Sequence, residues 1–83
     1  MDELERRVLE LLASACGDPR AAREPDLDLY GEALLDSFAW VQLLEALEDA
    51  FGLELWPTRV KPEDTATPAR LVALVRGMLG EGR

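Results

Sequence analysis

Gly17, Gly52 and Gly80 each follow an amphipathic segment, and this punctuation restricts how the chain can fold. Before each glycine, apolar residues recur at three- and four-residue steps, which is the spacing of one face of an α-helix. Glycine often ends helices because it adopts left-handed backbone angles without strain. No alternation typical of strands persists in the 83 residues. The sequence therefore predicts a small all-α bundle, and its length predicts a single domain over residues 1–83.

Capping residues indicate where these helices begin. Asp2 precedes Glu5 at the spacing of a capping box, so the first helix should begin there. The second should occupy residues 37–51, and Thr67 followed by Pro68 should open the last. The apolar stripes form the predicted core: Leu4, Val8, Leu11, Leu12 and Ala15; Trp40, Leu43, Leu44, Leu47 and Phe51; and Leu71, Leu74, Val75 and Met78.

The two connections between these helices differ in character. Prolines break residues 53–66 into turns, and a short helical turn near residues 62–64 would be a third helix, which brings the expected total to four. Residues 17–36 show no helical period, and a structureless connection of that length is uncommon in compact domains and often functional. Apolar side chains should hold it against the bundle: Leu27, Leu29, Tyr30, Leu34 and Leu35.

Acidic residues outnumber basic ones and gather in one part of the chain. There are 17 Asp and Glu against 9 Lys and Arg, which gives a net charge of −8. The stretch from Glu24 to Thr58 holds nine of the acids and no base. Nucleic acids and anionic lipids would be repelled, so neither is expected as a partner. A partner with a basic patch is favoured instead.

Several classes of function lack the residues they need. The chain has no histidine, so it has no Ser-His-Asp triad and no His-ligated metal, and no metal site is expected. Its one cysteine, Cys16, is interpreted as a small hydrophobe, with a regulatory thiol as the alternative. The acidic N-terminus does not resemble a signal peptide, and no apolar stretch is long enough to span a membrane. We therefore expect a cytoplasmic protein that is not an enzyme.

One face of the second helix combines apolar and acidic side chains. On a helical wheel, Phe38 and Val41 lie on the side turned away from the core stripe, among carboxylates. An apolar centre with a charged rim is typical of a transient docking surface. The predicted docking set is Phe38, Val41, Glu45, Glu48 and Asp49. An ordinary solvated acidic face is the alternative.

Ser37 is one of only two serines, with Ser14, and it opens the second helix. A serine at this place is commonly an N-cap, but Asp36 is already an adequate cap. A hydroxyl at a helix N-terminus also suits phosphate chemistry, because free N–H groups and the helix dipole favour an anion. Both interpretations of Ser37 stay open on local chemistry alone.

The run from Gly31 to Phe38 (GEALLDSF), which opens an acidic helix after a long loop, resembles the attachment site of acyl and peptidyl carrier proteins. These are four-helix domains, and the resemblance spans essentially the whole chain. It implies that a phosphopantetheinyl transferase attaches the 4′-phosphopantetheine arm of coenzyme A to Ser37. The thiol of the arm would then hold an acyl or aminoacyl group as a thioester. Asp36 would orient the hydroxyl or contact the transferase.

Within that superfamily the chain most resembles D-alanyl carrier proteins, over residues 34–51 (LLDSFAWVQLLEALEDAF) and the run that follows. This implies D-alanine or another amino acid as cargo, an adenylating ligase or acyltransferase that loads and unloads the arm, and a monomer. Two positions depart from the pattern. Thr65 stands where that family commonly has Trp, and Trp40 stands where carriers usually have Thr.

Two other functions remain as alternatives. The first is an acyl carrier of a specialised biosynthetic pathway of the polyketide or nonribosomal-peptide type. The second, from a different class, is an acidic helical adaptor that binds a basic partner and has no cofactor. The adaptor explains the acidic face but gives no reason for the long loop that ends at Asp36-Ser37.

Overall fold

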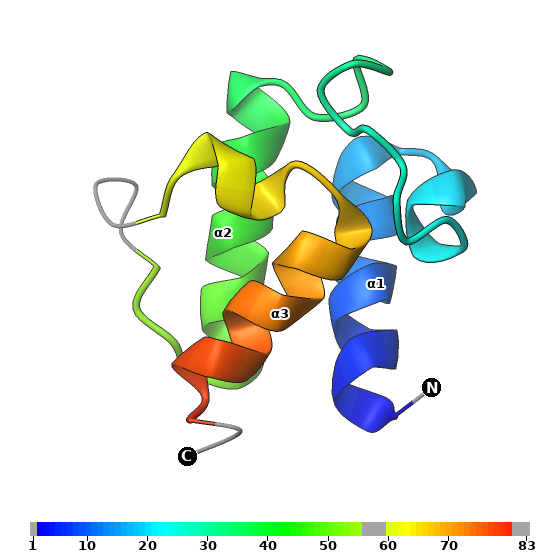
Figure 1. The fold of residues 1–83 in the computed structure, drawn as a ribbon. Helices are drawn as coiled ribbons and strands as arrows, with labels where there is room; N and C mark the ends of the chain where they lie inside the picture. Colours follow the sequence, from blue (N-terminus) through cyan, green and yellow to red (C-terminus); the bar gives the residue numbers. More distant parts are fainter. Residues whose placement is uncertain (1, 56–59, 81–83) are drawn as a thin grey trace.

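The computed structural model describes residues 2–55 and 60–80, and three α-helices dominate it (Figure 1). Two short 3-10 turns, η1 and η2, lie in the connections, and the described residues contain no strand. The elements are α1 (Glu3–Cys16), η1 (Pro19–Ala22), α2 (Ser37–Phe51), η2 (Pro62–Thr65) and α3 (Pro68–Met78). The all-α prediction is confirmed. The count of four helices is not, because the expected third helix is a four-residue 3-10 turn.

The first connection also differs from its prediction. It was expected to be without helix, yet η1 forms at its start. Asp18 caps this turn by accepting a hydrogen bond from the backbone N–H of Arg20 at 2.9 Å, and Pro19 occupies the first position. An acidic cap followed by proline is a helix start signal as well as a stop. The long loop that leads to α2 therefore begins after η1, at residue 23.

The helices pack around α1, which contacts both α2 and α3. In Figure 1, α1 runs upward and α2 runs downward beside it, so the two are antiparallel. α1 begins and α3 ends at the bottom of this view, whereas α2 begins at the top, where the long loop arrives. The first residue of α2 is thus at the end of the bundle opposite the start of α1.

The helix ends follow the predicted capping chemistry. Asp2 Oδ1 accepts from the backbone N–H of Glu5 at 2.8 Å, and Thr67 Oγ1 accepts from that of Arg70 at 3.2 Å. Gly52 follows α2 with a φ of +66°, in the left-handed region that glycine tolerates best. Local sequence chemistry therefore sets these boundaries.

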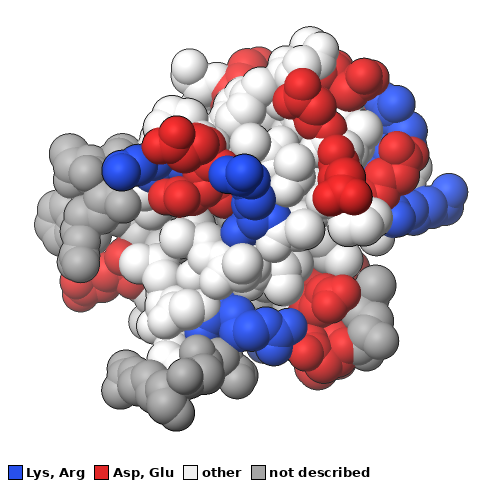
Figure 2. All heavy atoms as spheres, viewed as in Figure 1, with Lys and Arg blue, Asp and Glu red and all other residues white. Residues whose placement is uncertain are grey.

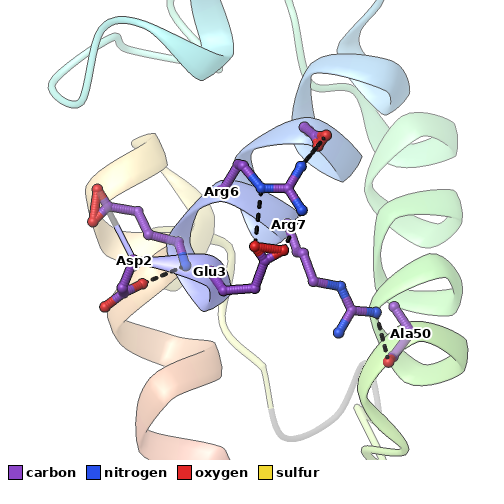
Figure 3. A network of polar contacts seen from close by, with 7 residues as sticks. Asp2, Glu3, Arg6, Arg7 and Ala50 are labelled. Atoms are coloured by element: carbon purple, nitrogen blue, oxygen red, sulfur yellow. Dashed lines mark hydrogen bonds and ion pairs between the residues drawn. The ribbon is translucent and has the colours of Figure 1, made fainter.

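Side chains from α1 support the ends of the other helices. The Arg7 guanidinium donates to the carbonyl oxygen of Ala50 at 3.2 Å (Figure 3) and lies 4.8 Å from the ring centroid of Phe51. α2 has no basic residue in its last turn, so Arg7 supplies the positive charge that favours a helix C-terminus. At the same end of the bundle, Arg76 in the last turn of α3 pairs with Asp2, the N-cap of α1, at 3.0 Å. The Glu5 N–H first, and then Arg76, hold the pKa of Asp2 below its usual value.

The core lies between the three helices and is closed on one side by the long loop. Leu43, Leu47 and Leu71 are completely buried, and so is Leu29 from the loop. Its full membership is Val8, Leu9, Leu12, Ala21, Leu27, Leu29, Leu35, Leu43, Leu44, Leu47, Leu55, Val60, Leu71 and Val75. The prediction that apolar loop residues anchor it is confirmed for Leu27, Leu29 and Leu35, whereas Tyr30 is 37% exposed. None of the helices in the described ranges is long and apolar enough to cross a membrane.

Candidate functional site

A tight turn in the long loop prepares the approach to α2. Asp28 Oδ1 accepts a hydrogen bond from the backbone N–H of Gly31 at 2.9 Å. A Cβ atom at Gly31 would collide with that carboxylate, so this close approach requires glycine. Ala33 then adopts a φ of +57°, which is uncommon for a residue with a side chain. After the turn, the backbone N–H groups of Leu34 and Leu35 donate to the Leu29 carbonyl oxygen at 2.9 and 3.2 Å, directly before α2 begins.

Backbone hydrogen bonds hold this loop to the segment before α3. The N–H of Leu29 donates to the carbonyl of Ala66 at 3.0 Å, and the N–H of Ala69 donates to that of Pro25 at 3.0 Å. These bonds join residues about forty positions apart, so local sequence patterns gave no signal of them. The part of the loop that leads into the turn before Ser37 is thereby fixed to the residues around the start of α3.

Asp36 caps α2, and Ser37 is its first helical residue. Asp36 Oδ1 accepts from the backbone N–H of Ala39 at 2.8 Å. Ser37 is exposed, and its hydroxyl makes no hydrogen bond with another described residue. The interpretation of Ser37 as the N-cap is therefore wrong, because Asp36 takes that role. The Ser37 hydroxyl is left accessible at the helix N-terminus, next to the free N–H groups of the first turn.

A hollow of about 400 Å³ lies beside Ser37. Its lining residues come from the long loop, α2 and η2: Tyr30, Leu35, Asp36, Ser37, Trp40 and Pro62. From the sequence, Tyr30 and Leu35 were expected to hold the loop against the bundle, and neither they nor Pro62 were associated with the site. The one sequence feature that connects any of the three with the site is that Leu35 directly precedes Asp36-Ser37.

One buried hydroxyl joins the three segments that line this hollow. Thr65 Oγ1 donates to the carbonyl of Pro62 at 2.9 Å and accepts from Trp40 Nε1–H at 3.1 Å. The Tyr30 hydroxyl lies 2.7 Å from the same oxygen and must be the donor, since the one Thr65 proton is already used. Trp40 and Thr65, the two departures from the D-alanyl carrier pattern, are thus in direct contact.

Trp40 does not take its predicted place in the core. Its side chain is partly buried and packs against the core edge with its indole N–H directed at Thr65. Phe51 is also partly buried, under the Arg7 guanidinium. Leu43, Leu44 and Leu47 of the same stripe are buried as predicted. The indole N–H has its polar partner in the buried Thr65 hydroxyl, so the partial exposure of Trp40 does not come from an unpaired N–H.

The exposed face of α2 matches the predicted docking set except at one position. Phe38 is 72% exposed and Val41 is 42% exposed, and Glu45 and Asp49 are exposed beside them. Glu48 is half-buried, and its Oε2 accepts from the backbone N–H of Leu55 at 3.0 Å. The chain after α2 folds back over this carboxylate, so the wheel prediction of an exposed Glu48 is wrong.

Charge is distributed unevenly over the surface. In Figure 2, acidic side chains lie at the upper right of the visible face, where the long loop lies, with basic side chains at the right edge, and further acidic groups lie lower on the same face. Arg20 of η1 pairs with Asp18 at 3.0 Å and with Glu32 of the long loop at 3.5 Å. The acidic stretch is therefore partly balanced at one side by η1.

Cys16 lies at the end of α1 and is partly buried. Burial, and to a smaller extent the neighbouring Asp18 carboxylate, raise the pKa of its thiol. A raised pKa lowers the fraction of reactive thiolate at neutral pH. This environment agrees with the interpretation of Cys16 as a small hydrophobe.

Sequence comparisons with known families and proteins show which family the chain belongs to. The sequence profile of the family described as "Phosphopantetheine attachment site" matches residues 6–75, which include the whole of α2 and the long loop. The D-alanyl carrier protein of Abiotrophia defectiva is 38% identical over 73 residues, which cover 88% of this chain and 92% of the relative. That of Bacillus velezensis is 36% identical over 70 residues, which cover 84% and 90%. D-alanyl carrier protein 1 of Lactiplantibacillus plantarum is 33% identical over 78 residues, which cover 94% and 96%.

These matches confirm the resemblance seen in the sequence. The cofactor expectation is confirmed at the level of the family, whose members hold 4′-phosphopantetheine covalently. Such a chain is a non-catalytic carrier and works with partner enzymes that use it as a substrate. The chain thus belongs to the phosphopantetheine attachment site family of carrier proteins.

Proposed function

We propose that Ser37 carries the 4′-phosphopantetheine arm and that the cargo is a D-alanyl group. The observation that carries the assignment of Ser37 is its accessible hydroxyl at the first position of α2, with the capping role already taken by Asp36. The open hollow beside it leaves room for a long flexible group. When attached, the arm supplies a terminal thiol that holds the cargo as a thioester.

The choice of D-alanine rests on the relatives. The three D-alanyl carrier proteins reported above are 33–38% identical to this chain over most of its length. Residues 34–51, which the sequence resemblance singled out, correspond to the approach to Ser37 and the whole of α2. The cargo of those relatives therefore becomes the first cargo to test here.

The partners proposed for this carrier are a phosphopantetheinyl transferase and an adenylating ligase or acyltransferase. Phe38 and Val41, with Glu45 and Asp49 at their rim, form the proposed docking surface, which we call the α2 docking face. A small apolar centre with acidic surroundings favours brief contacts with basic partners. We propose a cytoplasmic monomer in which residues 1–83 form one carrier domain.

The attachment site is tested by intact mass with a matched serine control. Wild type, Ser37→Ala and Ser14→Ala are incubated with coenzyme A, Mg²⁺ and a broad-specificity phosphopantetheinyl transferase. We expect one added arm on wild type and on Ser14→Ala, whose altered serine is exposed on α1, and none on Ser37→Ala. Circular dichroism checks that all three are folded. An arm on folded Ser37→Ala would contradict the assignment.

Asp36 has two roles that a pair of variants separates in the same assay. Asp36→Asn removes the charge but keeps a good N-cap, whereas Asp36→Ala removes both. Loss of the cap should cost about 1 kcal/mol of stability in Asp36→Ala only. If Asp36 contacts the transferase through its charge, both variants should be modified more slowly. Normal modification of Asp36→Asn would leave Asp36 with the cap alone.

The carrier of a specialised biosynthetic pathway stays the second candidate, because Trp40 and Thr65 depart from the D-alanyl carrier pattern at the hollow beside Ser37. A panel of adenylating ligases with D-alanine, L-alanine and other amino acids distinguishes the two. Loading by a D-alanine ligase alone supports the first candidate, and loading only by an enzyme of another pathway supports the second. A folded chain that accepts no arm favours the acidic adaptor.

A further inference from the structure

The hydrogen bonds of Thr65 join three segments that meet below Ser37. We call Tyr30, Trp40 and Thr65 the Thr65 latch. Its central hydroxyl uses its one proton on the Pro62 carbonyl and accepts from both Trp40 and Tyr30, so its bonding capacity is filled. Thr65 itself is completely buried. The latch therefore has one geometry in which every polar atom has a partner, and no buried side-chain polar atom of the described residues lacks one.

The latch forms the wall between the hollow and the core. Tyr30 and Trp40 line the hollow on one side, and Thr65 lies behind them. Trp40 stands three residues after Ser37, which places its side chain on the neighbouring turn of the same helix. On the inner side, Leu43 and Leu44 of α2 are buried. A group that extends from Ser37 into the bundle would have to displace the indole and break its bond to Thr65.

The segments that carry the latch are held by further bonds, so the wall resists separation. The Leu29 N–H to Ala66 carbonyl bond lies next to the Tyr30–Thr65 contact and connects the same two segments. Asp64 Oδ2 accepts from the backbone N–H of Lys61 at 3.1 Å and fixes the start of η2. The bond that joins α2 directly to η2 is that of Trp40 Nε1–H to Thr65 Oγ1, so a passage between these two elements opens only if this bond breaks.

We propose that the Thr65 latch limits the cargo to small groups, because it keeps whatever the arm holds in the outer hollow and closes the bundle to a long acyl chain. This inference rests on attachment of the arm at Ser37. A small polar cargo such as an aminoacyl group needs no apolar burial and loses nothing by staying outside. A long hydrocarbon chain would stay exposed to water, which is unfavourable in proportion to its apolar area. Trp40, Thr65 and Tyr30 act as positioning residues, and the chain itself selects against long acyl cargo.

The test compares cargo lengths on the intact protein. A broad-specificity transferase moves the acetyl- or octanoyl-phosphopantetheine arm from the corresponding coenzyme A thioester to the Ser37 hydroxyl and releases 3′,5′-ADP, and intact mass confirms each product. The melting temperature and the NMR signal of the Trp40 indole N–H, assigned by its loss in Trp40→Phe, are then recorded. The latch predicts the same melting temperature and the same indole signal with both cargoes, and stronger retention of the octanoyl form on a hydrophobic column. A merely structural role for Trp40 makes no such prediction about cargo length.

Two variants reverse the prediction. Trp40→Ala and Thr65→Ala should let the octanoyl chain enter, so that octanoyl raises the melting temperature above that of the acetyl form by about 5 °C or more. Thr65→Ser keeps the hydroxyl, so its acetyl and octanoyl forms should melt at the same temperature as each other, as the two wild-type forms do. If octanoyl stabilises the wild type and shifts the indole signal, the latch does not close the bundle. If neither arm attaches to the folded chain, the assignment of Ser37 fails first, and this inference fails with it.

Discussion

Among the described residues, Thr65 is the one polar side chain that is buried, and two of its three hydrogen-bond partners lie far from it in the sequence. Tyr30 is 35 residues away and Trp40 is 25 away. No local pattern indicates such a contact, and the sequence marked Thr65 and Trp40 only as departures from a family pattern. By contrast, the caps Asp2 and Thr67 act within three residues, and the sequence predicted both. Hydrogen bonds within a few residues could therefore be predicted from the sequence, whereas those between distant residues could not.

Thr65→Val tests the latch as a source of stability. Valine has the shape of threonine but no hydroxyl, so Trp40 Nε1–H and the Tyr30 hydroxyl lose their acceptor and the Pro62 carbonyl loses a donor. We expect the free energy of unfolding to fall by about 2–4 kcal/mol, measured by urea denaturation followed by circular dichroism. Thr65→Ser should cost about 1 kcal/mol, for the lost methyl group alone. Equal stability of Thr65→Val and wild type would contradict the hydrogen-bond account.

At the scale of elements, α2 packs one face against the core and exposes the other, which is the proposed docking face. Glu48 is a position where helical periodicity did not predict the burial of the side chain correctly. The wheel places Glu48 with Glu45 on the exposed arc. The segment after α2 then returns over Glu48 and uses its carboxylate to bind the Leu55 N–H. The bounds of α2 were predicted correctly because Asp36 and Gly52 act locally. The path of the segment after α2 depends instead on tertiary packing, because its Leu55 side chain is buried in the core.

Glu48 and Glu45 form a matched pair for separating structure from docking. Glu48→Ala should lower the free energy of unfolding by about 1–2 kcal/mol because it leaves the Leu55 N–H without its partner. Glu45→Ala should change stability by less than about 0.5 kcal/mol, since Glu45 is exposed. Glu45→Lys should instead slow loading by the ligase, and added salt should slow loading of the wild type for the same electrostatic reason. If folded Glu45→Lys were loaded at the wild-type rate across a salt series, the ligase would not bind through the α2 docking face.

At the scale of the whole molecule, the sequence predicted the all-α class of fold, and it placed Ser37 at the start of the second helix. Amphipathic stripes and glycine stops are sufficient for three helices, because each signal lies within the element it describes. The hollow beside Ser37 needed the structure, since its lining comes from the loop, α2 and η2 together. The turn η1 also needed the structure, because Asp18-Pro19 was interpreted only as the end of the first helix, whereas it also begins η1. The acidic balance of the chain concerns partners and association rates, not the fold.

We propose that Ser37 holds an arm that carries D-alanine. The most direct measurement is the intact mass of the wild-type chain after two steps, first with coenzyme A, Mg²⁺ and a phosphopantetheinyl transferase, then with ATP, D-alanine and a D-alanine-activating ligase. The account predicts one added arm, located at Ser37 by peptide mapping, then one added alanyl group that hydroxylamine removes. An unchanged mass in a folded, helical sample, or an arm on any other residue, would contradict it.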